Sequence, residues 1–442
     1  MAPRPGIEEE RGAAGRRRDA LGVRRGRSGV AGATLRRMRT PQEAVSIILT
    51  EARAPAQPEN CALGEATGRV LASDVHSDLD LPPFEKSAMD GFAVHRSDFE
   101  AGDPVAEVRL AVLGESRAGE PFGGPIPPGS CVEIYTGGEV PADCDAVVVV
   151  EKSRRDGDSV LLSDTPSPRQ NICARGEDLR EGDRVLGAGT RLSPSALSVL
   201  ASVGTDPVPV FPEPRVAILT TGDELVPPSQ RPGPGQIREG NTLHLAAMAR
   251  AAGAHVVRAG IVRDDAAELA ETFRAVLDEC QVLITTGGVS MGRYDLVGAA
   301  LEACGVRKIF HKVAIKPGRP IWFGRTESAL VFGLPGNPVS CLVGQEVFVR
   351  PALAKLGGES EDRWIPPLRR ARWKAPSTRR LDRQQNVPVE VRQAEDGVDE
   401  IAPVRWKSSA DIVGLSRASG LAVIPAETVL SEGDAAYFRP LF

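Results

Sequence analysis

The chain has 442 residues, of which 41% are hydrophobic and 26% charged, with 46 glycines and 36 prolines. These values exclude a disordered or collagen-like chain, and the length predicts several domains rather than one core. A formal net charge of -5 disfavours a general nucleic-acid-binding protein, and no apolar run reaches the roughly 18 to 20 residues that would span a membrane. The seven cysteines are scattered without a CxxC pair, which favours free thiols in a reducing cytoplasm.

Residues 1–37 are rich in arginine and contain few large apolar residues. Such a segment cannot bury enough apolar surface to fold alone. It lacks the apolar centre of a secretory signal, and its acidic run at residues 8–10 fits poorly with an organellar transit peptide. We expect a disordered tail. The alternative is that translation starts at Met38, since helical periodicity begins directly after that residue.

Residues 41–53 are predicted to form an amphipathic helix that follows the capping residue Thr40. A second helix is expected over 193–202. We predict that the two helices pack side by side in a discontinuous linker and dimerisation domain, formed by residues 38–80 and 181–212.

The segment between these two parts, residues 81–180, is predicted to be rich in β-strands. Short apolar runs such as 131–135 and 146–150 are separated there by glycine, proline and aspartate. This pattern predicts a β-rich insertion domain.

From residue 213 to residue 358, predicted strands and helices alternate. Strands are expected at 216–219, 256–259, 282–284 and 330–332, and helices at 243–252, 266–277, 296–304 and 340–355. Such alternation predicts right-handed crossovers and a parallel sheet with helices on both faces, which is a three-layer αβα domain. The short alternating runs of residues 359–442 predict a small C-terminal domain resembling a β-barrel.

Three polar, glycine-rich loops follow predicted strands of this sheet. They are Thr220-Thr221-Gly222-Asp223-Glu224, Thr285-Thr286-Gly287-Gly288-Val289-Ser290 and Gly333-Leu334-Pro335-Gly336-Asn337-Pro338. Ligands bind at the carboxyl ends of parallel strands, where glycine allows close backbone approach and helix N-termini attract anions. Each loop alone could be an ordinary tight turn. Together they predict a site for a phosphate-bearing ligand.

Carboxylates are concentrated at the same predicted edge. They are Asp223 and Glu224 in the first loop, Asp264 and Asp265 after the second strand, and Asp295. The last three precede helices, so helix capping explains them equally well, whereas Glu224 has no such explanation. Because carboxylates beside a phosphate site usually act through Mg²⁺, the sequence predicts magnesium here.

Lys312 and Lys316 lie four residues apart in HKVAIKPGR. In a strand, this spacing would put both ammonium groups on one face of the sheet. They then either form a solvated basic edge or neutralise the charge of the ligand.

Three further segments combine turn-forming and polar residues: 82–92, 135–141 and 175–178. Their composition predicts only loops. The residues by themselves therefore indicate a phosphate-bearing ligand and Mg²⁺, but they identify no reaction.

Taken in chain order, these segments resemble the motifs of the molybdopterin molybdenumtransferases, a family of bacterial molybdenum-insertion enzymes related to the C-terminal domain of gephyrin. The resemblance runs from about Met38 to the C-terminus. It rests on seven ordered motifs: PPFEKSAMDGFAV, YTGGEVP, RGEDLREGD, TTGDEL, TTGGVSMGRYD, KVAIKPGRP and GLPGNPVS.

The resemblance implies a cytoplasmic transferase of molybdenum cofactor biosynthesis. Its substrates would be molybdate and adenylylated molybdopterin, with Mg²⁺-dependent release of AMP. The resemblance also implies an elongated homodimer of four-domain subunits, in which the β-rich domain of one subunit approaches the α/β cleft of the other. The expected protein partners are the adenylyltransferase that makes the substrate and the molybdoenzymes that accept the cofactor. No nucleic-acid or membrane partner is implied.

By motif, the resemblance assigns a role in the insertion reaction to Asp90, Thr136, Glu224, Asp264, Lys312 and Lys316. It assigns metal binding to Glu224 and Asp295, and ligand binding to Thr221, Gly222, Gly287, Gly288, Ser290, Pro335, Gly336, Asn337 and Pro338. We hypothesise that the metal is held against the pyrophosphate, that the lysines concentrate the oxyanion, and that water attacks the α-phosphorus.

Two segments depart from the family pattern, Arg238-Glu239-Gly240-Asn241 and the position of Cys173, where a basic residue is common. These departures bear on peripheral phosphate contacts and on a preference for tungstate over molybdate.

Three other functions are compatible with parts of the chain. A molybdopterin adenylyltransferase is usually a single domain, which the upstream β segment disfavours. A gephyrin-like scaffold is disfavoured by the intact acidic and basic motif residues. A generic nucleotide-binding module is disfavoured because GxGxxG and GxxxxGKS/T are absent.

Overall fold

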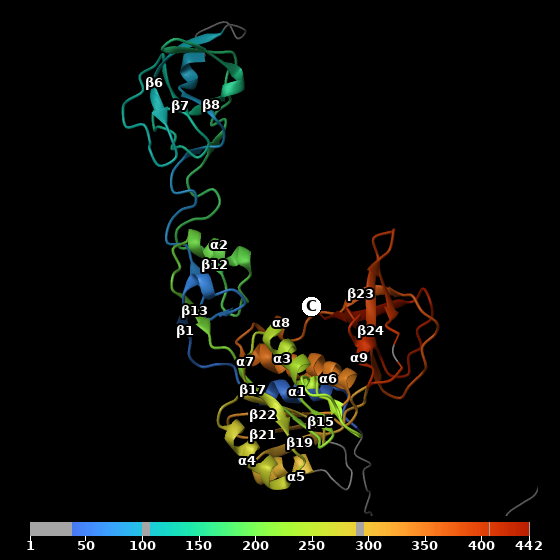
Figure 1. The fold of residues 1–442 in the computed structure, drawn as a ribbon. Helices are drawn as coiled ribbons and strands as arrows, with labels where there is room; N and C mark the ends of the chain where they lie inside the picture. The colour runs from blue at the N-terminus through green and yellow to red at the C-terminus, as the bar shows by residue number, and fades with distance from the viewer. Residues whose placement is uncertain (1–37, 100–106, 289–295, 406, 442) are drawn as a thin grey trace, which may run out of the picture. The chain divides into compact units, whose positions relative to one another are not determined.

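The computed structural model describes residues 38–99, 107–288, 296–405 and 407–441 (Figure 1). The predictions for residues 1–37, for Ser290 and for Asp295 lie outside the described residues.

A six-stranded sheet in the order β17-β14-β18-β22-β21-β19 forms the centre of the α/β domain. Its strands are β14 (Arg215–Thr221), β17 (His255–Val262), β18 (Val282–Thr286), β19 (Arg307–His311), β21 (Trp322–Arg325) and β22 (Leu330–Leu334). The first four strands in spatial order run parallel, as predicted. β21 is antiparallel to both neighbours, because the short connection from β21 to β22 permits only a hairpin.

Helices cover both faces of this sheet, which confirms the three-layer arrangement. α1 (Pro41–Glu51), α3 (Asn241–Ala251), α6 (Pro338–Gly344) and α7 (Arg350–Leu356) pack on one face, and α4 (Ala266–Leu277) and α5 (Leu296–Ala303) pack on the other. Side chains of β14 alternate between the two cores: Val216 and Ile218 belong to the first, and Ala217 and Leu219 to the second.

The helix predicted over 340–355 is interrupted. A π-helical segment, η4 (Gln345–Val349), separates α6 from α7. Pro351 lies in the first turn of α7. Because proline has no N–H and its ring clashes with the carbonyl four residues earlier, a regular α-helix cannot continue through this position.

The predicted pairing of the first helix with the helix at 193–202 is wrong. Ala44, Val45 and Ile48 of α1 are buried in the core of the α/β domain, together with Val216 and Phe348. α2 (Pro194–Ser202) packs in a different core. The N-terminal helix therefore completes one face of the α/β sheet instead of the linker.

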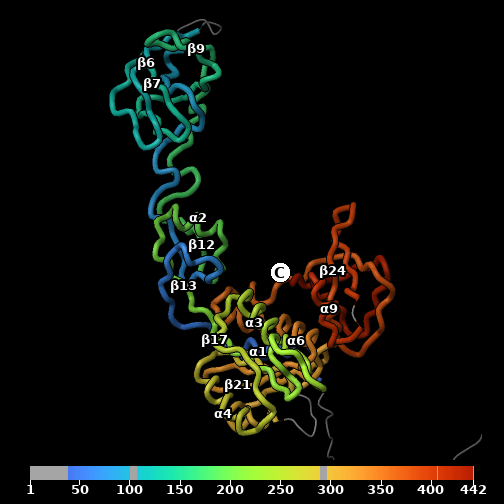
Figure 2. The backbone as a smooth tube through the Cα atoms, in the orientation of Figure 1, coloured from blue at the N-terminus to red at the C-terminus, as the bar shows by residue number. Residues whose placement is uncertain are grey.

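Two small sheets join segments from either side of the β-rich region. In the first, β13 (Val208–Phe211) lies between β1 (Glu59–Cys61) and β2 (Val70–Leu71), and in the second β12 (Arg184–Leu186) pairs with β3 (Val75–His76). The chain leaves this unit and returns to it (Figure 2) through two connecting segments. An isolated antiparallel β-bridge joins them, in which the N–H of Leu81 donates to the carbonyl of Leu179 at 2.7 Å.

The inserted region contains a six-stranded sheet in the order β8-β5-β7-β6-β10-β9. Its strands are β5 (Gly91–Val94), β6 (Val108–Ser116), β7 (Ser130–Ile134), β8 (Ala146–Val149), β9 (Ser153–Asp156) and β10 (Ser159–Leu162). A further pair joins β4 (Lys86–Ser87) to β11 (Ile172–Cys173). Phe92 and Val94 belong to one core and Ala93 to another, so β5 is buried on both faces.

The C-terminal region is a closed five-stranded barrel, in agreement with the predicted barrel-like domain. The strands are β23 (Arg369–Trp373), β24 (Gln384–Gln393), β25 (Asp399–Pro403), β26 (Gly420–Ile424) and β27 (Ala435–Pro440), and pairing of β24 with β26 closes the ring. A short strand of the preceding domain, β20 (Ile315–Lys316), adds to β24 in parallel. Trp373 and Phe438 are fully buried in the barrel core.

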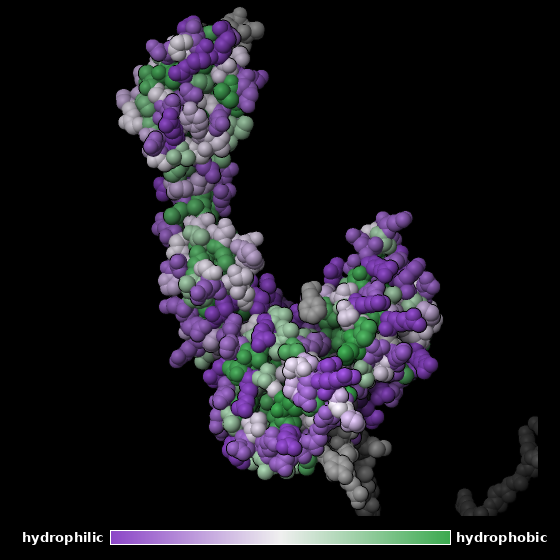
Figure 3. Space-filling view, in the orientation of Figure 1, coloured by the Kyte–Doolittle hydropathy of each residue, from purple (hydrophilic) through white to green (hydrophobic). Residues whose placement is uncertain are grey.

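All seven cysteines are free, as predicted. Across the described ranges, no helix has the length and apolar character needed to cross a membrane. On the face of the molecule drawn in Figure 3, hydrophilic residues surround hydrophobic patches of limited size.

Because Ile48 is fully buried against the α/β sheet, Ile48→Ala should lower the free energy of unfolding by about 2 to 4 kcal/mol. Val199→Ala is the control, since that α2 side chain is 38% exposed and should change stability little. Calorimetric unfolding of both variants checks this. Equal effects of the two substitutions would contradict the placement of α1.

Candidate functional site

The three glycine-rich loops meet at the carboxyl ends of β14, β18 and β22. The N–H of Gly287 donates to the carbonyl of Leu334 at 3.3 Å, and the Thr286 hydroxyl donates to the carbonyl of Pro335 at the same distance. Asn241, the first residue of α3, donates from its side-chain nitrogen to the carbonyl of Gly336 at 2.7 Å. The structure thus brings together the loops that the sequence predicts to share one edge.

Two of these glycines are required by the backbone. Gly287 and Gly288 have φ values of 91° and 59°, and a Cβ on Gly287 would lie 2.4 Å from the carbonyl oxygen of Thr221. A side chain at this position would therefore be strained and would also push the first and second loops apart.

A cavity of about 1110 Å³ opens beside these loops. Among the predicted residues, Thr221, Glu224, Gly287, Gly336, Asn337 and Pro338 line it. The predicted residues Gly222, Gly288 and Pro335 belong to the same loops but are not part of its lining. A cavity of this size is in the range of ligand-binding sites.

Several lining residues were not predicted. They include Glu239, Asn241 and His244, and, from the barrel, Ala410, Ile412, Leu415, Ser416 and Ala418, whereas Thr220 belongs to the first predicted loop. The barrel segment is tied to the third loop: Asn337 donates to the Ser409 hydroxyl at 2.9 Å, and the N–H of Val339 donates to the Ser409 carbonyl at 3.1 Å. The C-terminal domain therefore supplies one wall of the cavity.

Three carboxylates gather at the end of β14. The N–H of Asp264 donates to Asp223 at 3.3 Å, and the Glu224 carboxylate lies over Gly222, where an added Cβ would be 2.5 Å from Glu224 Oε2. Partial burial raises the pKa of Asp264, and the negative charges of Asp223 and Glu224 raise it further. The cluster therefore has excess negative charge at its centre.

Helix capping explains only one of the two adjacent aspartates. Asp265 is the N-cap of α4 and accepts hydrogen bonds from the N–H groups of Ala267 and Glu268. Asp264 does not cap the helix, and a hydrogen bond with the Thr221 side chain partly offsets the rise in its pKa. Within the described ranges, no group of three or more His, Cys, Asp or Glu residues has the arrangement of a complete metal site.

Lys312 and Lys316 do not lie on one strand, so the condition under which they would share a face is not met. β19 ends at His311, Lys312 has a positive φ of 71°, and Lys316 belongs to β20, which pairs with the barrel. The two ammonium groups therefore do not share one face of a strand. Lys316 is exposed and Lys312 half-buried, and neither lines the cavity.

Asp90 and Thr136 are in contact, although they are far apart in sequence. One oxygen of Asp90 accepts hydrogen bonds from the N–H of Thr136 at 2.7 Å and from its hydroxyl at 2.8 Å. These two hydrogen bonds, the backbone one first, lower the pKa of Asp90. Both residues are exposed in the β-rich region and neither lines the cavity of the same chain.

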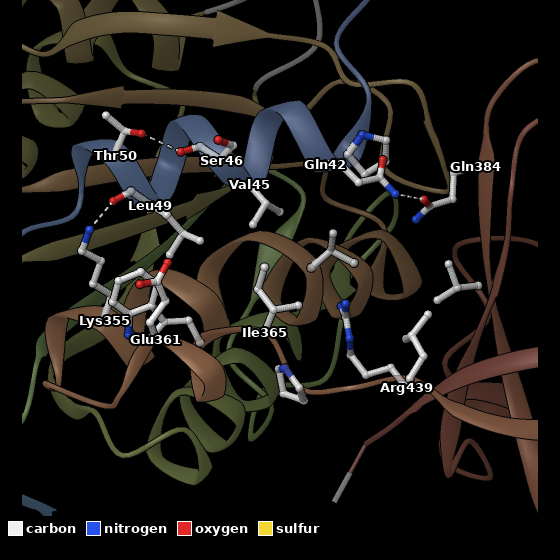
Figure 4. Close-up of a pocket in the computed structure, with 16 residues that line it drawn as sticks. Gln42, Val45, Ser46, Leu49, Thr50, Lys355, Glu361, Ile365, Gln384 and Arg439 are labelled. Carbon is white, nitrogen blue, oxygen red and sulfur yellow. Dashed lines mark hydrogen bonds between the residues drawn. The ribbon is translucent and has the colours of Figure 1, made fainter. Parts of the chain in front are cut away.

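A second cavity, of about 800 Å³, lies against α1 (Figure 4). Gln42 donates to Gln384 of the barrel at 3.1 Å, and Lys355 donates to the carbonyl of Leu49 at 2.8 Å. The cavity is lined by none of the predicted site residues, so we assign the candidate site to the larger cavity.

Comparison with protein families gives matches along almost the whole described chain. The model described as the MoeA N-terminal region (domain I and II) matches residues 39–204. The probable molybdopterin binding domain matches residues 217–355, and the MoeA C-terminal region (domain IV) matches residues 370–441.

Individual relatives agree with these matches. The molybdopterin molybdenumtransferase of Haemophilus influenzae is 39% identical over 75% of this chain and 80% of its own length. The corresponding protein of Nostoc sp. is 34% identical over 84% of this chain and 86% of its own length. A crystal structure of the molybdopterin biosynthesis moeA protein from Pyrococcus horikoshii superposes with a TM-score of 0.77 at 28% identity, covering 91% of this chain and 99% of that one.

The close approach at Gly287 gives a testable prediction. Gly287→Ala should lower the affinity for a phosphate-bearing ligand more than about tenfold, because the displaced loops can no longer converge. Gly305→Ala is the matched control, since Gly305 also has a positive φ of 82° but has no atom within 4 Å of an added Cβ. Titration calorimetry with AMP checks this, and equal affinities in the two variants would contradict it.

Proposed function

The chain belongs to the molybdopterin molybdenumtransferase family, and on that premise we propose that it inserts molybdenum from molybdate into adenylylated molybdopterin and releases AMP. The observation that carries the proposal is the cavity lined by the three glycine-rich loops, by Glu224 of the carboxylate cluster and by a wall of the barrel. In the reaction, the bond between the α-phosphorus and the bridging oxygen breaks. The released AMP gains the oxygen of water, and the bridging oxygen stays on the pterin phosphate. Molybdate oxygen that the pterin sulfurs displace leaves as water.

Phosphate recognition is the task best suited to the loops. Their glycines bring backbone N–H groups to the end of the sheet, and α6 begins directly after Asn337, so that the positive end of its dipole faces the same edge. The interlocked hydrogen bonds of Asn241 and Thr286 hold these loops in place before ligand binds. Such preorganisation reduces the ordering cost of binding.

The carboxylate cluster has the type of ligand atoms that Mg²⁺ prefers, although its described members do not form a complete metal site by themselves. Asp223, Glu224 and Asp264 offer only oxygen ligands, which this ion prefers. The pKa of Asp264 is raised first by partial burial and then by the neighbouring negative charges, which a cation would offset. We propose that Glu224 and Asp264 hold the ion, with Asp295 as the further ligand implied by the family motif. When bound, Mg²⁺ would make the α-phosphorus more electrophilic and neutralise the leaving phosphate.

Lys312 and Lys316 remain candidates for attracting molybdate. Lys316 lies at the junction of the α/β domain with the barrel, where β20 pairs with β24. An exposed ammonium group at this junction would raise the local concentration of a dianion. We propose this role for both lysines, although they act from different segments rather than from one strand.

We further propose that Asp90 and Thr136 serve the site of a partner subunit in a homodimer. The two residues are held together in one exposed pair, and they do not line the cavity of their own chain. In a homodimer, these two motif residues could contact the ligand in the cavity of the second subunit, which they do not do in their own chain.

The adenylyltransferase alternative is less well supported, because family matches extend over regions on both sides of the α/β domain. A scaffold without catalysis would not need the carboxylate cluster. AMP release that depends on molybdate distinguishes insertion from both alternatives.

Purified protein should release AMP from adenylylated molybdopterin only when molybdate and Mg²⁺ are both present. Glu224→Gln should lower this rate by more than about a hundredfold while the ligand still binds, since the amide cannot supply the charge of the carboxylate. Glu268→Gln, on the exposed face of α4, is the control. Release of AMP without molybdate would refute the insertion reaction. Full activity of Glu224→Gln would refute the role of Glu224.

Mg²⁺ should raise the melting temperature of the protein at neutral pH. The raised pKa of Asp264 means that its contribution to stability is present at low pH and is lost as the pH rises through the folded-state pKa. A cation offsets this loss, so the effect of Mg²⁺ should disappear in acid and should be smaller in Asp264→Asn. Asp278→Asn, at the exposed end of the same helix, should respond like the wild type. An equal response of all three proteins would exclude Asp264 as a ligand.

A further inference from the structure

The cavity contains a buried carboxylate to which the proposed reaction assigns no role. Glu239 is only 6% exposed and lines the cavity. It lies between β16 (Ile237–Arg238) and α3. Because a buried carboxylate requires hydrogen-bond donors, the partners of its two oxygens indicate its role.

One oxygen of Glu239 is occupied by the protein itself. Oε1 accepts hydrogen bonds from the N–H of Thr242 at 2.7 Å and from the Thr220 hydroxyl at 3.2 Å. The N-cap residue of α3 is Gly240, which has no side chain to cap the helix, so Glu239 caps it from one residue earlier. A carboxylate oxygen accepts about two hydrogen bonds, and Oε1 has both.

The other oxygen remains available. Within the described part of the chain, Oε2 has no hydrogen-bond donor, and it is not among the buried polar atoms that are sealed from solvent. Since Glu239 lines the cavity, this oxygen opens into it. Helix capping therefore accounts for Oε1 of Glu239, and it leaves Oε2 facing the cavity.

The surroundings of Glu239 suit a flat heterocycle. Apolar side chains of Leu225, Ile237, Ile412 and Leu415 line the same cavity, as does His244. Burial lowers the pKa of His244, so its ring is neutral at pH 7 and offers one N–H donor and one acceptor nitrogen. An apolar cavity with a few placed polar groups is the usual setting for such a ring.

We propose that Oε2 of Glu239 binds the 2-amino-4-oxopyrimidine edge of the pterin, accepting hydrogen bonds from its amino group and the adjacent ring N–H. This inference rests on the proposed function, because it presumes a pterin substrate. The adenine ring of the same substrate has one amino group beside ring nitrogens that only accept, and these would repel a carboxylate. Glu239 therefore selects the pterin end for this part of the cavity and fixes the orientation of the substrate.

The test compares Glu239→Gln with the wild type and with Glu271→Gln, a control on the exposed face of α4. Binding of adenylylated molybdopterin to Glu239→Gln should weaken about tenfold to a hundredfold, the range for a hydrogen bond to a charged group. The affinity for AMP alone should be unchanged. A general folding defect would lower both, so AMP serves as the internal control.

A second measurement uses two small probes that differ in one group. A 6-hydroxymethylpterin should compete for the wild-type site at lower concentration than its 2,4-dioxo analogue, which places a carbonyl against the carboxylate. In Glu239→Gln, the ratio of the concentrations at which the two probes compete should fall towards one. An unchanged preference, no preference in the wild type, or equal loss of AMP and pterin affinity would overturn the inference.

The outcome is separable from that of the proposed function. If the wild type binds the pterin substrate through Glu239 but releases no AMP with molybdate, the reaction is wrong and the binding role stands. If AMP is released normally by Glu239→Gln with an unchanged KM, the reaction stands and the role of Glu239 is wrong.

Discussion

The contact between Gly287 and the carbonyl of Thr221 is the constraint on which the candidate site depends. Without a Cβ at residue 287, the ends of β14 and β18 approach closely enough for their loops to form one surface. Asn241 then joins this surface to the third loop through the carbonyl of Gly336. The third loop in turn holds the barrel wall through the hydrogen bond from Asn337 to Ser409.

Much of this arrangement could be predicted, because it follows from local rules. Periodicity identifies strands and helices, and parallel strands put their carboxyl ends on one edge, so loops far apart in sequence can be assigned to one site. The same periodicity does not determine which helix packs against which strand or helix. α1 has an apolar face, as predicted, but only the folded chain reveals that this face covers Val216 and Phe348 instead of α2.

The residues that were missed or misplaced all depend on contacts between segments distant in sequence. Ser409 and Ile412 follow strands of the barrel, and nothing in their local pattern indicates a cavity wall. Lys312 and Lys316 are spaced so that one strand would put them on the same face. However, Lys312 has a positive φ just after one strand ends, and Lys316 lies in a second strand that pairs with the barrel. Glu239 differs, since its segment stood out in the sequence, although only its burial distinguishes a ligand contact from a surface charge.

The pairing of β20 with β24 makes the boundary between the last two domains different from an ordinary linker. Ile315 and Lys316 of the α/β domain pair as a strand with Gln384 and Gln385 of the barrel. The sheet of the C-terminal domain therefore includes a strand that belongs to the α/β domain in sequence. A chain cut between them would yield two fragments with exposed strand edges, which favour association with other chains. Evolutionary exchange of this barrel for another module would have to replace a piece of the α/β domain as well.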